Sequence, residues 1–80
     1  MALVFDQGIV RFDGHCVVED AMKLLEIFQT APEAQVDLTA CQTMHMALLQ
    51  VLVAARPRVV ASPANRTMAD LIHRMIGDPA

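Results

Sequence analysis

The chain has 80 residues and a mass of 8.8 kDa, which allows one domain, residues 1–80, and no second core. It is 55% hydrophobic but only 4% aromatic, and its formal net charge is −3. The hydrophobic content excludes a disordered chain, while the shortage of aromatic and basic residues argues against a nucleic-acid partner. Arg56 and Arg58 interrupt the longest apolar stretch, so direct membrane insertion is not expected.

The N-terminus carries neither a basic region nor the cleavage pattern of an export signal. The two cysteines of a chain without such a signal are expected to stay reduced, which predicts a cytoplasmic protein. Cys16 and Cys41 do not form a Cys-x-x-Cys motif and have no adjacent cation in sequence, so both are interpreted as small buried apolar residues.

Hydrophobic periodicity predicts four strands and three helices in the order β-β-α-β-α-β-α. The expected strands are 2–5, 9–13, 35–41 and 58–61. The expected helices are 18–30, 43–56 and a last one that starts at Ser62-Pro63 and stops at Gly77. Strands that alternate with helices indicate an α/β fold with a four-stranded mixed sheet.

Each predicted element has an expected buried face. In helix 18–30 this face comprises Val18, Ala21, Met22, Leu24, Leu25 and Phe28, and Ile27 lies among polar residues. In the third strand Val36, Leu38 and Ala40 share a face. The apolar face of the last helix comprises Ala64, Met68, Leu71, Ile72 and Met75.

The segment 36–52, VDLTACQTMHMALLQVL, combines a strand with an Asp-Leu step and an apolar helix. It resembles the central motif of the STAS domain (sulphate transporter and anti-sigma-factor antagonist) family. Gly14 through Leu25 and Ser62-Pro63-Ala64 are similar to flanking stretches of that family. The resemblance implies a STAS-like fold and a non-enzymatic regulator of the anti-sigma-factor-antagonist or chemotaxis type, acting in bacterial signal transduction and transcription regulation.

The sequence departs from the family at its regulatory serine. If Asp37 and Leu38 align with the strand motif, the family's Asp-Ser-x-Gly falls on His45, Met46, Ala47 and Leu48. Met46 has no hydroxyl group, so the resemblance implies a divergent member that is not switched by serine phosphorylation there. The nearest hydroxyl group belongs to Thr43 and is not expected to replace the serine.

The predicted helix 43–56 is apolar on all sides. One stripe, which should face the sheet, comprises Met44, Leu48, Val51, Leu52 and Ala55. A two-layer domain of this size has little material to cover the opposite side, which predicts an interaction surface unless a neighbouring helix covers it. The predicted partner-binding residues are Thr43, His45, Met46, Leu49, Gln50 and Val53.

By the same resemblance, the expected partner is an anti-sigma factor, a kinase-type regulator or a chemotaxis component. The alternative is a small STAS-like subunit of a bacterial lipid-asymmetry ABC transporter, with the transporter ATPase as partner. A homodimer through the same helix is a third alternative.

No catalytic, metal or cofactor site is expected. The three histidines, at positions 15, 45 and 73, lie on separate predicted elements and lack the spacing of a metal site. Cys41 and His45 have no orienting carboxylate in the sequence pattern, and no glycine-rich phosphate loop is present. Asp37 is a single carboxylate at a predicted strand end, where it is expected to accept hydrogen bonds from loop N–H groups.

Overall fold

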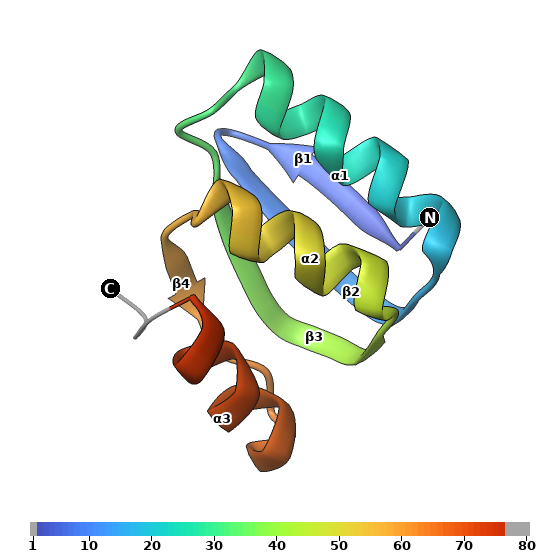
Figure 1. Ribbon diagram of the computed structural model, residues 1–80, viewed down its shortest axis with the longest axis vertical. Helices are drawn as coiled ribbons and strands as arrows, with labels where there is room; N and C mark the ends of the chain where they lie inside the picture. Colours follow the sequence, from blue (N-terminus) through green and yellow to red (C-terminus); the bar gives the residue numbers. More distant parts are fainter. Residues whose placement is uncertain (1, 77–80) are drawn as a thin grey trace.

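Four strands form one mixed sheet in the computed structural model, which describes residues 2–76 (Figure 1). The elements in chain order are β1 Leu3–Asp6, β2 Ile9–Cys16, α1 Val18–Thr30, β3 Gln35–Met44, α2 Met46–Ala55, β4 Val59–Ala61 and α3 Arg66–Met75. The predicted α/β class, the element order and the mixed sheet are therefore confirmed. The predicted stop at Gly77 lies outside the described residues.

The strands lie in the order β1-β2-β3-β4, with β1 antiparallel to β2 and the other two neighbouring pairs parallel. The turn of the β1–β2 hairpin has φ of +52° at Gln7 and +78° at Gly8. Positive φ at both central residues matches the right-handed twist of the two strands, and glycine adopts it without steric cost. The predicted turn at Gly8 is therefore present.

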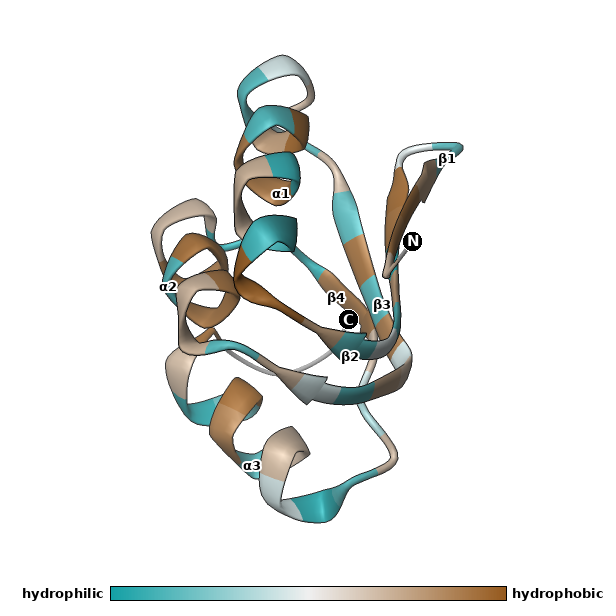
Figure 2. Cartoon of the chain, turned by 90° about the vertical axis from the view of Figure 1, so that its right-hand side faces the viewer, coloured by the Kyte–Doolittle hydropathy of each residue, from teal (hydrophilic) through white to brown (hydrophobic). Residues whose placement is uncertain are grey.

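The three helices lie on one side of the sheet (Figures 1 and 2). Helices α1 and α2 pack against each other, and α3 continues this layer beside α2 near β4 (Figure 1). The core between the layers contains residues from all seven elements: Leu3, Val10, Phe12, Leu24, Val36, Leu38, Leu48, Leu52, Val59 and Ile72 are its most deeply buried side chains. The other face of the sheet is not covered by any helix among the described residues (Figure 2). It carries Arg11 and Asp37, whose neighbours along the two strands, Val10, Phe12, Val36 and Leu38, are buried in the core.

Strands β2 and β3 run farther than the sequence predicted. Asp13-Gly14 does not end β2, because parallel pairing with β3 continues to Cys16. The register shifts twice along this pair, and each shift places one extra residue in β3. The first extra residue turns Cys41 into the core and Ala40 out to solvent, so the expected face of Val36, Leu38 and Ala40 was wrong at its last member.

Helix α1 is turned relative to the expected orientation. Leu24, Ile27 and Phe28 are buried, whereas Met22 is 69% exposed. Val18 and Leu25 are also exposed, so the prediction was wrong for these positions and for Ile27. The helix contacts both β1 and α2, and this packing selects the stripe through Leu24, Ile27 and Phe28.

Helix α3 begins later than expected. Asn65, not Ser62, caps it, with the Asn65 side-chain oxygen accepting the Met68 N–H at 3.1 Å. The Ser62 hydroxyl group instead lies 3.3 Å from His73 Nε2, and Ala64 precedes the helix. Asparagine caps a helix as well as serine does, and local sequence therefore left the starting point undetermined.

Candidate functional site

Helix α2 is anchored at both ends. At its start His45 Nδ1 accepts the Ala47 N–H at 3.0 Å, and the His45 N–H donates to the Cys16 carbonyl at 2.9 Å. The second bond ties the beginning of α2 to the end of β2. At the other end Arg56 adopts a left-handed conformation with φ of +48°, and its N–H donates to the Leu52 carbonyl at 2.8 Å. The sheet and these two caps therefore set the direction in which α2 presents its side chains.

Met46 lies on the solvent side of α2, as predicted. Its side chain is 59% exposed, Gln50 is exposed and Val53 is half-buried. Leu48 and Leu52 point into the core on the opposite side. The predicted outward face therefore exists in this part of the helix.

Leu49 does not belong to that exposed face. It is only 5% exposed, and it belongs to the same buried cluster as Ile72 of α3, with which it also lines a cleft. The alternative in which a neighbouring helix covers the second face of α2 thus holds at this position. The reason is the placement of α3, which no local pattern in residues 43–56 encodes.

Thr43 and Met44 belong to β3, although the predicted helix included both. They pair with His15 and Cys16 across the parallel ladder. The Thr43 hydroxyl oxygen lies 2.8 Å from His15 Nδ1, within hydrogen-bond distance. Thr43 therefore lies at the mouth of the site, two residues before the His45 cap, rather than on the helix face with Met46.

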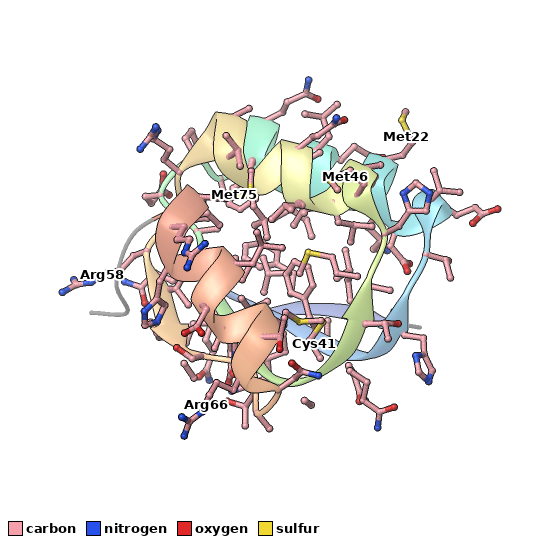
Figure 3. The ribbon with its side chains drawn as sticks, turned by 60° about the horizontal axis from the view of Figure 1, so that its bottom comes forward. Met22, Cys41, Met46, Arg58, Arg66 and Met75 are labelled. Atoms are coloured by element: carbon pink, nitrogen blue, oxygen red, sulfur yellow. The ribbon has the colours of Figure 1, made fainter. Side chains whose placement is uncertain are left out.

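Exposed apolar side chains on and next to α1 enlarge the site. Val17 and Val18 are about half exposed at the start of α1, and Met22 is the most exposed of the large apolar residues described. The Cys16–His45 bond brings the starts of the two helices together, and Figure 3 shows Met22 and Met46 on the outer side of the helices. Sequence reasoning missed these residues because it assigned Val18 and Met22 to the core. We define the helical face as Val17, Val18, Met22, Met46, Gln50 and Val53.

A cleft of about 360 Å³ lies beside the helical face, between α2, α3 and the end of β3. Apolar side chains dominate its lining, and no charged side chain contributes to it. The residues that line it are Gln42, Thr43, Met44, Leu49, Asn65, Thr67, Met68, Leu71 and Ile72. The volume suits one large apolar side chain, or a few neighbouring ones, from a docked surface.

The two cysteines are buried thiols, as predicted. Burial raises the pKa of Cys41 to about 12 and also raises the pKa of Cys16. A cysteine acts as a nucleophile through its thiolate, and a raised pKa keeps each of the two thiols protonated at neutral pH. Within residues 2–76, no cluster of three or more histidine, cysteine or carboxylate side chains is suited to hold a metal ion.

Asp37 lies on the uncovered face of the sheet, inside β3 rather than at a strand end. Its carboxylate accepts the Thr39 N–H at 2.9 Å, next to the first register shift, and lies 3.9 Å from Arg11 Nε. The hydrogen bond from Thr39 and the nearby guanidinium group lower the pKa of Asp37. The carboxylate therefore stabilises the irregular part of β3.

Because the folded chain favours ionised Asp37, its contribution to stability is present at neutral pH. The contribution is lost as the pH falls through the lowered pKa, below about 4. We expect Asp37→Asn, which keeps an acceptor for Thr39, to cost about 0.5–1 kcal/mol at pH 7 and nothing near pH 2. Urea unfolding of both proteins from pH 7 to pH 2 measures the difference, and a constant gap across this range would contradict the prediction.

None of the helices described in residues 2–76 has both the length and the apolar character needed to cross a bilayer.

Comparison with protein-family models, with curated proteins and with solved structures finds no match to this chain. The function is therefore inferred from the residues of the helical face and of the cleft beside it.

Proposed function

We propose that this chain is a non-enzymatic protein–protein interaction module of the STAS-like type, which docks a partner through its helical face. The observation that carries the proposal is the exposure of Met46, at 59%, on a helix whose two ends are both capped. An exposed methionine on a fixed helix offers an adaptable apolar contact whose position is set before binding. The resemblance of residues 36–52 to the central STAS motif supports the same helix as the docking element.

The surroundings of Met46 favour a protein partner over a small molecule. Val17, Val18 and Met22 extend the apolar surface across two helices, and the cleft beside α2 offers a place for an inserted side chain. Contiguous exposed apolar surface on a small domain is typical of an interaction site. No serine hydroxyl group stands at position 46, so phosphorylation at this position does not control binding.

The test is binding by Met46→Asp. The purified chain is used to isolate bound proteins from native lysate, and affinity for the identified partner is then measured by calorimetry. A charge at the centre of an apolar contact should weaken binding at least tenfold, by about 1.4 kcal/mol or more. The melting temperature should stay within a few degrees of the original value, because the side chain is exposed.

Val4→Asp is the matched control, since Val4 is an exposed apolar residue on β1, away from the helical face. It should bind as the original chain does. Equal binding by Met46→Asp would exclude the helical face. The identity of the partner then decides between regulation and transport: an anti-sigma factor or kinase-type regulator supports the first, and a transporter ATPase supports the alternative.

A further inference from the structure

The groove between α2 and α3 is lined by apolar side chains that recur at one-turn intervals on both helices. On α2 they are Leu49 and Val53, and on α3 they are Met68, Leu71 and Met75. Leu71 is 43% exposed and Met75 is 37% exposed, so the α3 side of the groove is open to solvent. Figure 3 shows Met75 on the part of α3 that lies next to α2. The groove therefore continues the apolar cleft toward the ends of the two helices.

The shape of this groove suits a helix. An amphipathic helix docks in a groove through apolar side chains that recur at i, i+3, i+4 and i+7. The groove offers contacts at the same intervals, because Leu49 and Val53 are four residues apart, as are Leu71 and Met75. The cleft of about 360 Å³ at its centre has room for the largest of the docked side chains.

The charged side chains around the groove are mostly basic. Residues 45–76 carry four arginines and one carboxylate. Arg56 caps the end of α2, Arg66 is the first residue of α3, and Arg74 lies in its last turn. The hollow that Arg74 lines shares Leu71 with the apolar cleft. Positive charge therefore stands directly beside the apolar contacts.

The described chain does not neutralise these arginines. Within residues 2–76 the one ion pair joins Arg11 and Asp37. Asp70 lines the same hollow as Arg74, but the two do not form an ion pair there. All four arginines of residues 45–76 are exposed. Their charge is therefore available to a partner from outside, and it repels a basic one.

The rest of the chain has the opposite charge. Residues 1–44 carry seven carboxylates and two basic side chains, and the whole chain has a net charge of −3. An acidic partner is therefore attracted to the α2–α3 side and repelled from the other elements. This distribution of charge favours one docking position over the alternatives.

We propose that the partner presents an acidic amphipathic helix, which lies in the α2–α3 groove. Its largest apolar side chain enters the cleft beside Leu49 and Leu71, and its carboxylates face Arg66 and Arg74. This inference depends on the function proposed above, since the groove borders the helical face and shares Val53 with it. It adds the secondary structure and the charge of the docking segment.

Two synthetic peptides test the proposal. Both are about 15 residues long, or four helical turns, with leucines at i, i+3, i+4 and i+7 and alanines to favour the helix. One carries glutamates at the remaining positions and the other carries lysines. Each is titrated at low salt into the full chain labelled with nitrogen-15. The glutamate peptide should bind at least fivefold more tightly, should shift amide signals of α2 and α3, and should lose its advantage at high salt.

Two variants separate the apolar contact from the charged one. Leu71→Gln should weaken binding of both peptides about fivefold, and the exposure of Leu71 predicts that the fold is kept. Arg74→Glu should reduce the preference for the glutamate peptide about fivefold. Lys23→Glu is the matched control, because it changes the net charge equally but lies on α1. It should leave the preference nearly unchanged.

Equal affinity for the two peptides would overturn the proposal, as would the absence of shifts in α2 and α3 at millimolar peptide. An equal effect of Lys23→Glu and Arg74→Glu would also overturn it, since net charge alone would then explain the preference. These outcomes are separate from the test with Met46→Asp. If that variant weakens binding of the isolated partner and the glutamate peptide fails, only the acidic helix is refuted. If the peptide binds as expected and Met46→Asp has no effect on the isolated partner, only docking through the helical face is refuted.

Discussion

Phe12→Ala is expected to lower the free energy of unfolding by about 3–5 kcal/mol, the cost typical of removing a fully buried aromatic ring. Phe12 is 0% exposed and lies in β2, the strand that pairs with both β1 and β3. A domain of this length has a total stability of about 4–12 kcal/mol, so the substitution removes a large part of it. Urea unfolding followed by circular dichroism measures the loss.

Phe5→Ala is the matched control because Phe5 lies in the same hairpin but is 43% exposed. Its expected cost is below about 1.5 kcal/mol, since half of its ring already contacts water. Similar costs at the two positions would contradict the burial described for Phe12. Unfolding of Phe12→Ala without denaturant would agree with the prediction and would place the total stability at the lower end of the range.

Ile72→Ala is expected to detach α3 while the rest of the fold persists. Within the described chain Ile72 is the fully buried residue of α3, at 1% exposed, and Met68 and Ile76 pack only partly against the core. The lost contacts and the resulting cavity should cost about 2–4 kcal/mol, which exceeds what the partly buried neighbours of Ile72 can supply. Amide hydrogen exchange should then be much faster in α3 than in β2 or β3.

Leu71→Ala tests the same helix at an exposed position. Leu71 is 43% exposed and lines the cleft, so its truncation should leave exchange in α3 nearly unchanged. Equal acceleration of exchange in α3 and in the sheet by Ile72→Ala would show that α3 unfolds only together with the core.

The candidate site could be predicted in part. The excess of apolar residues in 43–56 indicates that α2 has more apolar surface than one sheet face can bury, and Met46 is exposed as expected. Leu49 could not be distinguished from Met46 by pattern, because the two residues are equally apolar and lie near each other on the helix. The position of α3 separates them, and this position depends on a cap at Asn65 and on one buried isoleucine.

The contribution of α1 to the surface could not be predicted for a related reason. Val18, Met22 and Leu25 form as regular an apolar stripe as Leu24, Ile27 and Phe28 do. Periodicity shows that a helix can bury one side, but two overlapping stripes leave its rotation open. Packing against β1 and α2 chooses between the stripes and leaves the first one in solvent.

Local chemistry alone determined the α/β class, the order of the seven elements and the hairpin turn at Gly8. These features depend on spacing and backbone freedom between near neighbours in the chain. Tertiary structure alone decided the two extra residues in β3, the rotation of α1 and the burial of Leu49. Each of these features depends on which helices and strands pack against a given side chain. Those elements are far apart in the sequence, so local pattern does not specify the contact.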